Sequence, residues 1–163
     1  MSKKRRPHGF PIFDTNIYSS QREKSKPEDF NKALFPLVVY YELAATKISQ
    51  RQKQTLDALR LFHEKNKTLL TPTKDDWIVA ASVVWQLHQR RRTDLPDSAT
   101  FLQNDALICR TAHVLLQKNP EQNCFIVTEN ISHFQLIADC LNEPAKKSGR
   151  KLKIISGDDY FGV

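Results

Sequence analysis

The chain has few cysteines and no long hydrophobic run. Each of these features excludes some classes of protein. Its three cysteines are widely spaced and form no CxxC pair, which argues against a structural zinc site or a disulfide framework. No apolar stretch approaches the roughly 18 residues needed to span a bilayer. The basic segment 1–7 is not followed by the apolar core of a secretion signal. We therefore expect a cytoplasmic protein, not bound to a membrane, with small buried thiols.

The sequence also lacks an internal repeat, and the basic stretch at 146–151 reads as a loop rather than a domain linker. A chain of 163 residues is long enough for one domain with a substantial core. We place this domain at 10–163, after a disordered basic arm at 1–9. The net charge of +7 favours an anionic partner, of which nucleic acid is the commonest.

Short apolar runs alternate with longer helical patterns along the chain. The runs that predict strands are 10–13, 68–71, 124–128 and 152–156. Helix starts are predicted at Pro27 and, as a start or a kink, at Pro36. Whole helices are predicted at 49–65, from Thr73 to about residue 90, at 101–118 and at 130–141. The stripe expected to be buried on the helix after Thr73 is Trp77, Ala80, Ala81, Val84, Leu87 and His88. This alternation predicts an α/β fold with a short parallel sheet flanked by helices.

Three acids stand in apolar surroundings. Asp14 follows the apolar run 10–13, Glu42 follows 37–41, and Asp105 lies on the apolar stripe of its predicted helix. No Lys or Arg occurs within four residues of Asp14 or Glu42. A carboxylate in apolar surroundings costs several kcal/mol unless a cation compensates it.

Each acid alone is better explained as a boundary residue, or as a helix acid paired with a distant arginine. All three in one chain favour a different explanation, a shared divalent cation. Oxygen-only ligands suit a hard ion such as Mg²⁺ or Mn²⁺, and such a site commonly hydrolyses phosphodiesters. Asp14 also ends a predicted strand, the edge of a parallel sheet where ligands bind.

The segment 128–134 supplies the remaining candidates. Thr128 closes a predicted strand, so it falls at the same sheet edge as Asp14. Glu129 could turn inward or outward. Asn130 is equally consistent with a helix cap and with a site role. For His133, in the first turn of the next helix, packing or capping is favoured over a role as a base.

Four segments, in this order, resemble the motif series of PIN-domain nucleases: residues 12–16, 41–43, 104–108 and 127–134. Within that group, the chain is most similar to the VapC-type toxins of bacterial toxin–antitoxin pairs. The resemblance covers roughly residues 10–160. It implies a PIN-like fold and a Mg²⁺- or Mn²⁺-dependent endoribonuclease that a cognate antitoxin inhibits.

The resemblance also assigns roles by motif position. Asp14, Glu42 and Asp105 are the metal-site acids and the catalytic residues. The residues that would position substrate are Thr15, Asn16, Asn104, Thr128 and His133. Asn130 stands where the family often has a fourth acid, and His133 stands where it often has an Asp. The fourth metal ligand is therefore Glu129 or Asn130, or else the site uses three acids and water.

Substrate and partner surfaces are less defined. Arginines 90–92 and the basic residues of 146–153 could contact RNA phosphates, and Tyr18, Tyr40 or Tyr41 could stack on unpaired bases. Solvated faces and core packing are the alternatives. The apolar segments 30–48 and 50–64 could bind an antitoxin helix, form a homodimer contact or belong to the core. Competing functions are a PIN nuclease of RNA maturation or DNA processing without an antitoxin, and a non-catalytic PIN module that binds RNA or protein.

Overall fold

The computed structural model describes residues 7–20, 26–90, 99–119, 123–142 and 150–162. Predictions that fall outside these ranges include the arm at 1–6, Arg91 and Arg92, and most of the basic loop at 143–149. Residues 7–9 lead directly into the first strand. Gly9 has a φ of 138°, and a Cβ atom there would lie 2.5 Å from the Asn123 carbonyl oxygen, so a side chain at this position would be strained.

The three main strands form one parallel sheet. They are β1 (Phe10–Phe13), β4 (Cys124–Val127) and β5 (Lys153–Ile155), in the order β1-β4-β5. Their register pairs Phe13 with Val127, so β1 and β4 end at the same level. The strand predictions at 10–13, 124–128 and 152–156 are confirmed, and all three strands are short apolar runs.

A second parallel pair extends the sheet on the other side of β1. It consists of β2 (Phe35–Pro36) and β3 (Leu69–Leu70), and an isolated bridge joins Ile12 of β1 to Leu34. The prediction of a strand within 68–71 is confirmed. The sequence did not predict β2, because Pro36 was taken only as the start or kink of a helix. Pro36 is both the end of β2 and the N-cap of the next helix.

Helices separate the strands, as expected for an α/β chain. They are α1 (Thr15–Ser20), α2 (Pro27–Asn31), α3 (Leu37–Ala45), α4 (Gln50–Lys65), α5 (Lys74–Gln89), α6 (Ala99–Lys118), α7 (Ile131–Asn142) and α8 (Gly157–Phe161). Reciprocal capping boxes start α4 at Ser49 and α5 at Thr73. The α/β class and the parallel sheet are confirmed, while α1 and α8 were not predicted because both are too short to show a helical period.

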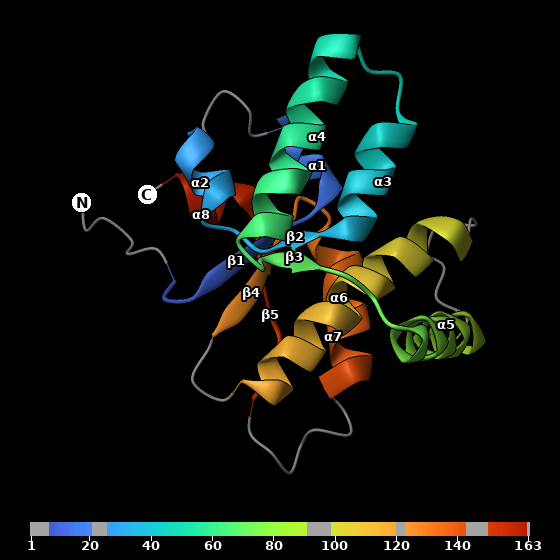
Figure 1. The fold of residues 1–163 in the computed structure, drawn as a ribbon. Helices are drawn as coiled ribbons and strands as arrows, with labels where there is room; N and C mark the ends of the chain where they lie inside the picture. Colours follow the sequence, from blue (N-terminus) through green and yellow to red (C-terminus); the bar gives the residue numbers. More distant parts are fainter. Residues whose placement is uncertain (1–6, 21–25, 91–98, 120–122, 143–149, 163) are drawn as a thin grey trace.

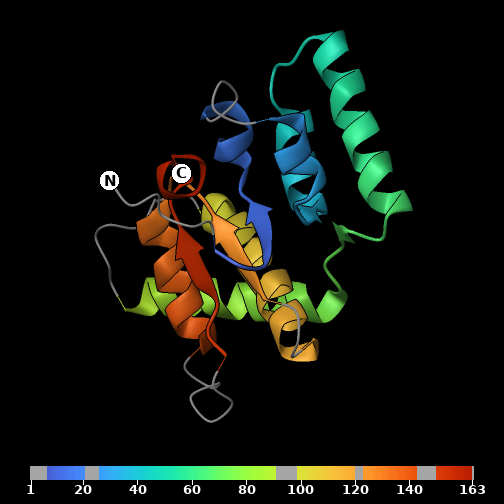
Figure 2. The same cartoon turned by 90° about the vertical axis from the view of Figure 1, so that its left-hand side faces the viewer.

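The helices gather on two sides of the strands. In Figure 1, α3 and α4 stand together above the sheet, while α5, α6 and α7 lie below and to the right of it. Figure 2 shows α5 running crosswise to the strands, behind α7. The main core lies between the sheet and these helices, and a second apolar cluster surrounds Phe13, Phe125 and Tyr160. None of the described helices is long and apolar enough to cross a membrane.

The predicted stripe of α5 is partly wrong. Ala80, Val84 and Leu87 are buried as expected, but Trp77 is 46% exposed, and Ala81 and His88 are exposed as well. The buried face is rotated toward Asp76 and Val83, because Asp76 is held inward by an ion pair with α6. The three cysteines are free and buried, as expected.

Candidate active site

Asp14 and Thr128 lie side by side at the carboxyl ends of β1 and β4. The Asp14 backbone N–H donates to the Val127 carbonyl oxygen at 3.0 Å, which continues the ladder between the two strands. The Thr128 hydroxyl donates to Asp14 Oδ2 at 2.8 Å, and the Thr15 backbone N–H donates to Oδ1 at 2.7 Å. Both oxygens of a carboxylate that is only 5% exposed are therefore fixed by the strand ends.

Glu42 connects three helices at this edge of the sheet. It projects from α3, and its Oε1 accepts a hydrogen bond from the Asn104 side-chain amide of α6 at 2.8 Å. Its Oε2 accepts a short hydrogen bond from the Thr15 hydroxyl at the start of α1. Thr15 thus contacts two of the predicted acids, Asp14 through its backbone and Glu42 through its side chain. Asn104, predicted from its motif position, holds Glu42 in place.

Asp105 completes the cluster from α6. Burial, followed by the charges of Asp14 and Glu42, raises the pKa of Asp105 to about 8. Burial also raises the pKa of Asp14 to about 6, against the opposing hydrogen bonds from Thr128 and Thr15, and the charge of Glu42 adds to the rise. Thr15 bonds to both Asp14 and Glu42, and Asn104, the neighbour of Asp105, bonds to Glu42. The three acids that the sequence singled out therefore lie at one edge of the sheet.

The cluster has no cationic partner among the described residues. The ion pairs in those parts of the chain join Lys53 to Asp57, Arg60 to Glu64 and Arg110 to Asp76, and none includes Asp14, Glu42 or Asp105. Like charges held together without compensation raise one another's pKa. Three carboxylates that need a cation are a donor set that fits a hard divalent ion.

The acids do not form a closed ligand shell as they stand. No three His, Cys, Asp or Glu side chains in the described ranges are arranged to hold a metal ion. The hydrogen bonds of Glu42 explain this, since Thr15 and Asn104 each occupy one of its oxygens. Metal binding would therefore require side chains to rotate within the cluster.

A second network surrounds Thr128 and contains the other predicted residues. The Thr128 hydroxyl accepts hydrogen bonds from the Asn130 backbone N–H at 2.9 Å and from the Asn16 amide at 3.5 Å. The Asn16 side-chain oxygen accepts from the Glu129 backbone N–H at 3.2 Å. Asn16 therefore joins the start of α1 to the loop after β4, and the Thr128 hydroxyl joins that loop to Asp14.

Asn130 and His133 bond to each other. The Asn130 side-chain nitrogen lies 2.7 Å from His133 Nδ1, and the Asn130 carbonyl accepts from the Phe134 N–H at 3.2 Å. Asn130 is thus at the N-terminus of α7, which is the capping position that the sequence allowed. The Glu129 side chain is exposed. In this arrangement the Asn130 side chain is engaged by His133, so the structure does not single out a fourth ligand.

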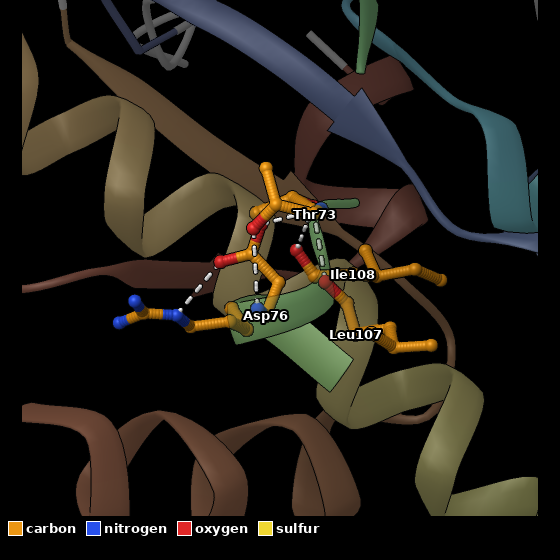
Figure 3. Close-up of polar contacts among 6 residues, drawn as sticks. Thr73, Asp76, Leu107 and Ile108 are labelled. Carbon is orange, nitrogen blue, oxygen red and sulfur yellow. Dashed lines mark hydrogen bonds and ion pairs between the residues drawn. The ribbon is translucent and has the colours of Figure 1, made fainter. Parts of the chain in front are cut away.

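The sequence analysis missed the contact that holds α6 beside α5. The Arg110 guanidinium donates to Asp76 Oδ1 at 3.0 Å, while Asp76 Oδ2 accepts from the Thr73 backbone and hydroxyl (Figure 3). Burial opposes ionisation of Asp76, but the hydrogen bonds from Thr73 and Arg110 outweigh it and lower the pKa of Asp76. The capping box was visible in the sequence, whereas the partner Arg110 lies 34 residues away. This contact fixes the helix that carries Asn104 and Asp105.

Of the basic residues proposed to contact phosphate, Arg150 has a structural role instead. Its guanidinium donates to the Asn119 carbonyl at 2.9 Å and to the Asn123 side chain at 2.8 Å. A cation bonded to carbonyls at a helix C-terminus stabilises that helix end. Arg150 therefore ties the end of α6 to the start of β4, and a contact of this residue with RNA phosphate stays a prediction.

Comparison with known proteins adds no assignment. A scan against protein-family models, a search of curated proteins and a search of solved structures each found no match to this chain. What can be said of function therefore rests on the residues of the site and on their geometry.

Proposed function

We propose that this protein is a metal-dependent endoribonuclease with a PIN-like fold. The observation that carries the proposal is the cluster of Asp14, Glu42 and Asp105 at one edge of the sheet, which has no cationic partner among the described residues. Burial, and then the neighbouring acids, raise the pKa of Asp14 and Asp105. The cluster lies at the carboxyl ends of β1 and β4. On the other side of β1 from β4, the chain continues to β2, so the order of the strands reverses at this position. Ligand sites of open parallel sheets occur at such points.

The residues of the chain would divide the work of the site. Mg²⁺ or Mn²⁺, when bound, supplies positive charge to a scissile phosphate and lowers the pKa of a water nucleophile. Asp14 is the fixed ligand, because both of its oxygens are already oriented by Thr128 and Thr15. Glu42 and Asp105 approach from α3 and α6. Asn16 and Thr128 would hold the loop that borders the substrate.

The toxin assignment is a narrower part of the same proposal. A ribonuclease that cleaves cellular RNA unselectively harms its own cell, and a toxin of this kind is held inactive by an inhibitory partner. The chain offers an apolar groove of about 630 Å³ between its first four helices. The apolar side chains that line it include Tyr18, Phe30, Leu43, Leu56, Leu59 and Phe62. An amphipathic antitoxin helix would bind such a groove through its apolar face.

Tyr18 supports an occupant of this groove. Its phenolic oxygen is buried and has no hydrogen-bond partner in the described part of the chain. Burial also raises the pKa of Tyr18 far above its usual value. A buried hydroxyl without a partner costs about 1–3 kcal/mol, and a docked helix would remove that cost only if the ring turned its hydroxyl into the groove. A homodimer contact over the same groove is the competing explanation.

The decisive experiment is cleavage of a labelled RNA with Mg²⁺ and with EDTA, using the wild type and Asp14→Asn. We expect cleavage only by the wild type with metal. Asp139→Asn is the matched control, because Asp139 is an exposed acid outside the cluster. Cleavage that survives in EDTA or in Asp14→Asn would overturn the assignment.

Co-expression separates the toxin from the alternatives. Growth arrest that requires Asp14 and disappears when a neighbouring small gene is expressed supports the toxin. An active enzyme without toxicity supports RNA maturation or DNA processing. Metal-independent binding of RNA or protein without cleavage supports a non-catalytic module.

A further inference from the structure

Tyr41 is an exposed aromatic residue that immediately precedes Glu42 of the acid cluster in the sequence. Its side chain is 63% exposed, although it precedes Glu42 on α3. The four tyrosines of the chain all lie in described ranges, and the other three are at least partly buried. Tyr18 stacks on Phe30 with ring centroids 4.9 Å apart, and both rings line the apolar groove. Tyr41 alone presents its ring to solvent.

The ring of Tyr41 rests on a braced neighbour. It meets Tyr40 edge to face, with ring centroids 5.7 Å apart and planes at 69°. The Tyr40 hydroxyl donates to Asp57 at 2.8 Å and accepts from Lys53 at 3.1 Å. Lys53 and Arg60 also lie over the Tyr40 ring, at 5.3 and 5.6 Å from its centroid. A ring supported in this way loses little freedom when a ligand binds it.

The position of Tyr41 fits a nucleotide bound at the acids. Consecutive Cα atoms are about 3.8 Å apart, and the Glu42 carboxylate already contacts α1 and α6 at the site. A phosphate held at the acids would therefore have its own nucleosides within reach of the Tyr41 ring. Tyr41 lies about 100° around α3 from Glu42, and its side chain is exposed.

Charge also favours a base over a phosphate as the contact here. The acid cluster repels phosphate until a cation binds, so substrate affinity near it must come from neutral groups. The flat face of a base carries no net charge and stacks on an aromatic ring whatever the sequence. The chain as a whole is basic, with a net charge of +7, which attracts the polyanion while the stacked base fixes its register.

We propose that Tyr41 stacks on an unpaired base next to the scissile phosphate, which makes single-stranded RNA the substrate. This rests on the proposed nuclease function, which it deepens. Bases of a duplex are already stacked on one another and could not reach the ring, whereas those of loops and single strands can be splayed onto aromatic side chains. Tyr41 is the site's base-binding residue, and Glu42 beside it belongs to the metal cluster.

The test measures RNA affinity separately from cleavage. Binding of a fluorescein-labelled single-stranded RNA is followed by anisotropy with Ca²⁺ in place of Mg²⁺, so that the acid cluster holds a cation while the catalytic metal is absent. Tyr41→Ala should weaken binding by about 5- to 150-fold, the range found for loss of one base–aromatic stack. Tyr41→Phe should bind like the wild type. Trp85→Ala is the matched control, because Trp85 on α5 is also 63% exposed and should leave binding unchanged.

An abasic substrate locates the contact. Removing the single base that Tyr41 stacks on should weaken binding by the wild type about as much as Tyr41→Ala does, and should cost the variant nothing further. Three results would overturn the proposal. They are unchanged RNA affinity in Tyr41→Ala, affinity losses that add fully to those of the variant at every abasic position, and an equal loss of affinity for duplex RNA. A changed oligomeric state in Tyr41→Ala with unchanged RNA affinity would also overturn it, because Tyr41 would then cover a protein contact.

The two proposals fail separately. If the wild type binds RNA through Tyr41 but does not cleave it in Mg²⁺, the nuclease function is wrong and the stacking contact remains. If the wild type cleaves RNA and Tyr41→Ala neither weakens binding nor raises KM for a single strand, the nuclease function remains and the stacking contact is wrong.

Discussion

Asp105→Asn is expected to change how the stability of the metal-free protein depends on pH. Burial and the charges of Asp14 and Glu42 raise the pKa of Asp105 from 3.8 to about 8. Between these values the folded protein holds a proton that the unfolded chain has released. The contribution of this group to stability is therefore complete below about pH 4. It is lost progressively as the pH rises through 8.

The size of the effect follows from the same two pKa values. A difference of about 4 units, at 1.36 kcal/mol per unit, sets an upper bound of about 6 kcal/mol. Asp105 is only half-buried, and solvent screens its interactions, so we expect about 2 to 3 kcal/mol between pH 5 and pH 8. Within the described residues the Asp105 side chain makes no hydrogen bond that an amide would lose. The difference in unfolding free energy between the variant and the wild type should therefore be small at pH 5 and grow by this amount by pH 8.

The assay is urea unfolding of the wild type and Asp105→Asn in EDTA, at intervals from pH 5 to pH 8.5. Burial lowers the pKa of His63 and His113, so these residues add stability as the pH rises through 6.5. Both proteins carry them, and their effect cancels in the difference. Adding Mg²⁺ at pH 8 should stabilise the wild type more than the variant. Parallel pH profiles for the two proteins in EDTA would refute the electrostatic reasoning.

Three further outcomes follow from the site and its support. Asp14→Asn should reduce RNA cleavage by at least about 100-fold, measured with Mg²⁺ in excess, because it removes the fixed carboxylate. Asn130→Asp should tighten Mn²⁺ binding in calorimetry, and Glu129→Gln should weaken activity less than Asp14→Asn; complete loss in Glu129→Gln would make Glu129 the fourth acid. Arg110→Met should lower the free energy of unfolding by about 1–3 kcal/mol, because Asp76 is left buried without its partner, and unchanged urea unfolding would contradict this.

The sequence predicted the site better than it predicted the helix faces. Asp14 and Thr128 each follow a short apolar run that could only be a buried strand, and parallel strands end at one edge. That was sufficient to place them together. Glu42 and Asp105 needed a different cue, the absence of a local cation beside acids in apolar surroundings. Their common position depends on how α3 and α6 pack, which local patterns do not encode.

Other features depended on partners distant in sequence. Trp77 looked buried because its spacing fits the apolar stripe of α5, but the ion pair of Asp76 with Arg110 rotates the helix. Arg150 belongs to a basic stretch whose sequence gives no sign that its guanidinium bonds to the Leu116 and Asn119 carbonyls at the end of α6. In each case the deciding contact joins residues more than 30 positions apart, and a single sequence carries no record of that proximity.

The cost of the acid cluster bears on which function the chain performs. If Asp105 alone destabilises the metal-free protein by about 2 to 3 kcal/mol near pH 8, it removes a large part of a stability that is typically about 5–15 kcal/mol. A module that only bound RNA or protein would gain stability from Asn at this position and lose nothing. A metal-dependent nuclease recovers the cost when its cation binds and needs the charge for catalysis. A large pH-dependent difference in EDTA that Mg²⁺ abolishes would therefore favour the enzyme over the binding module, before any substrate is known.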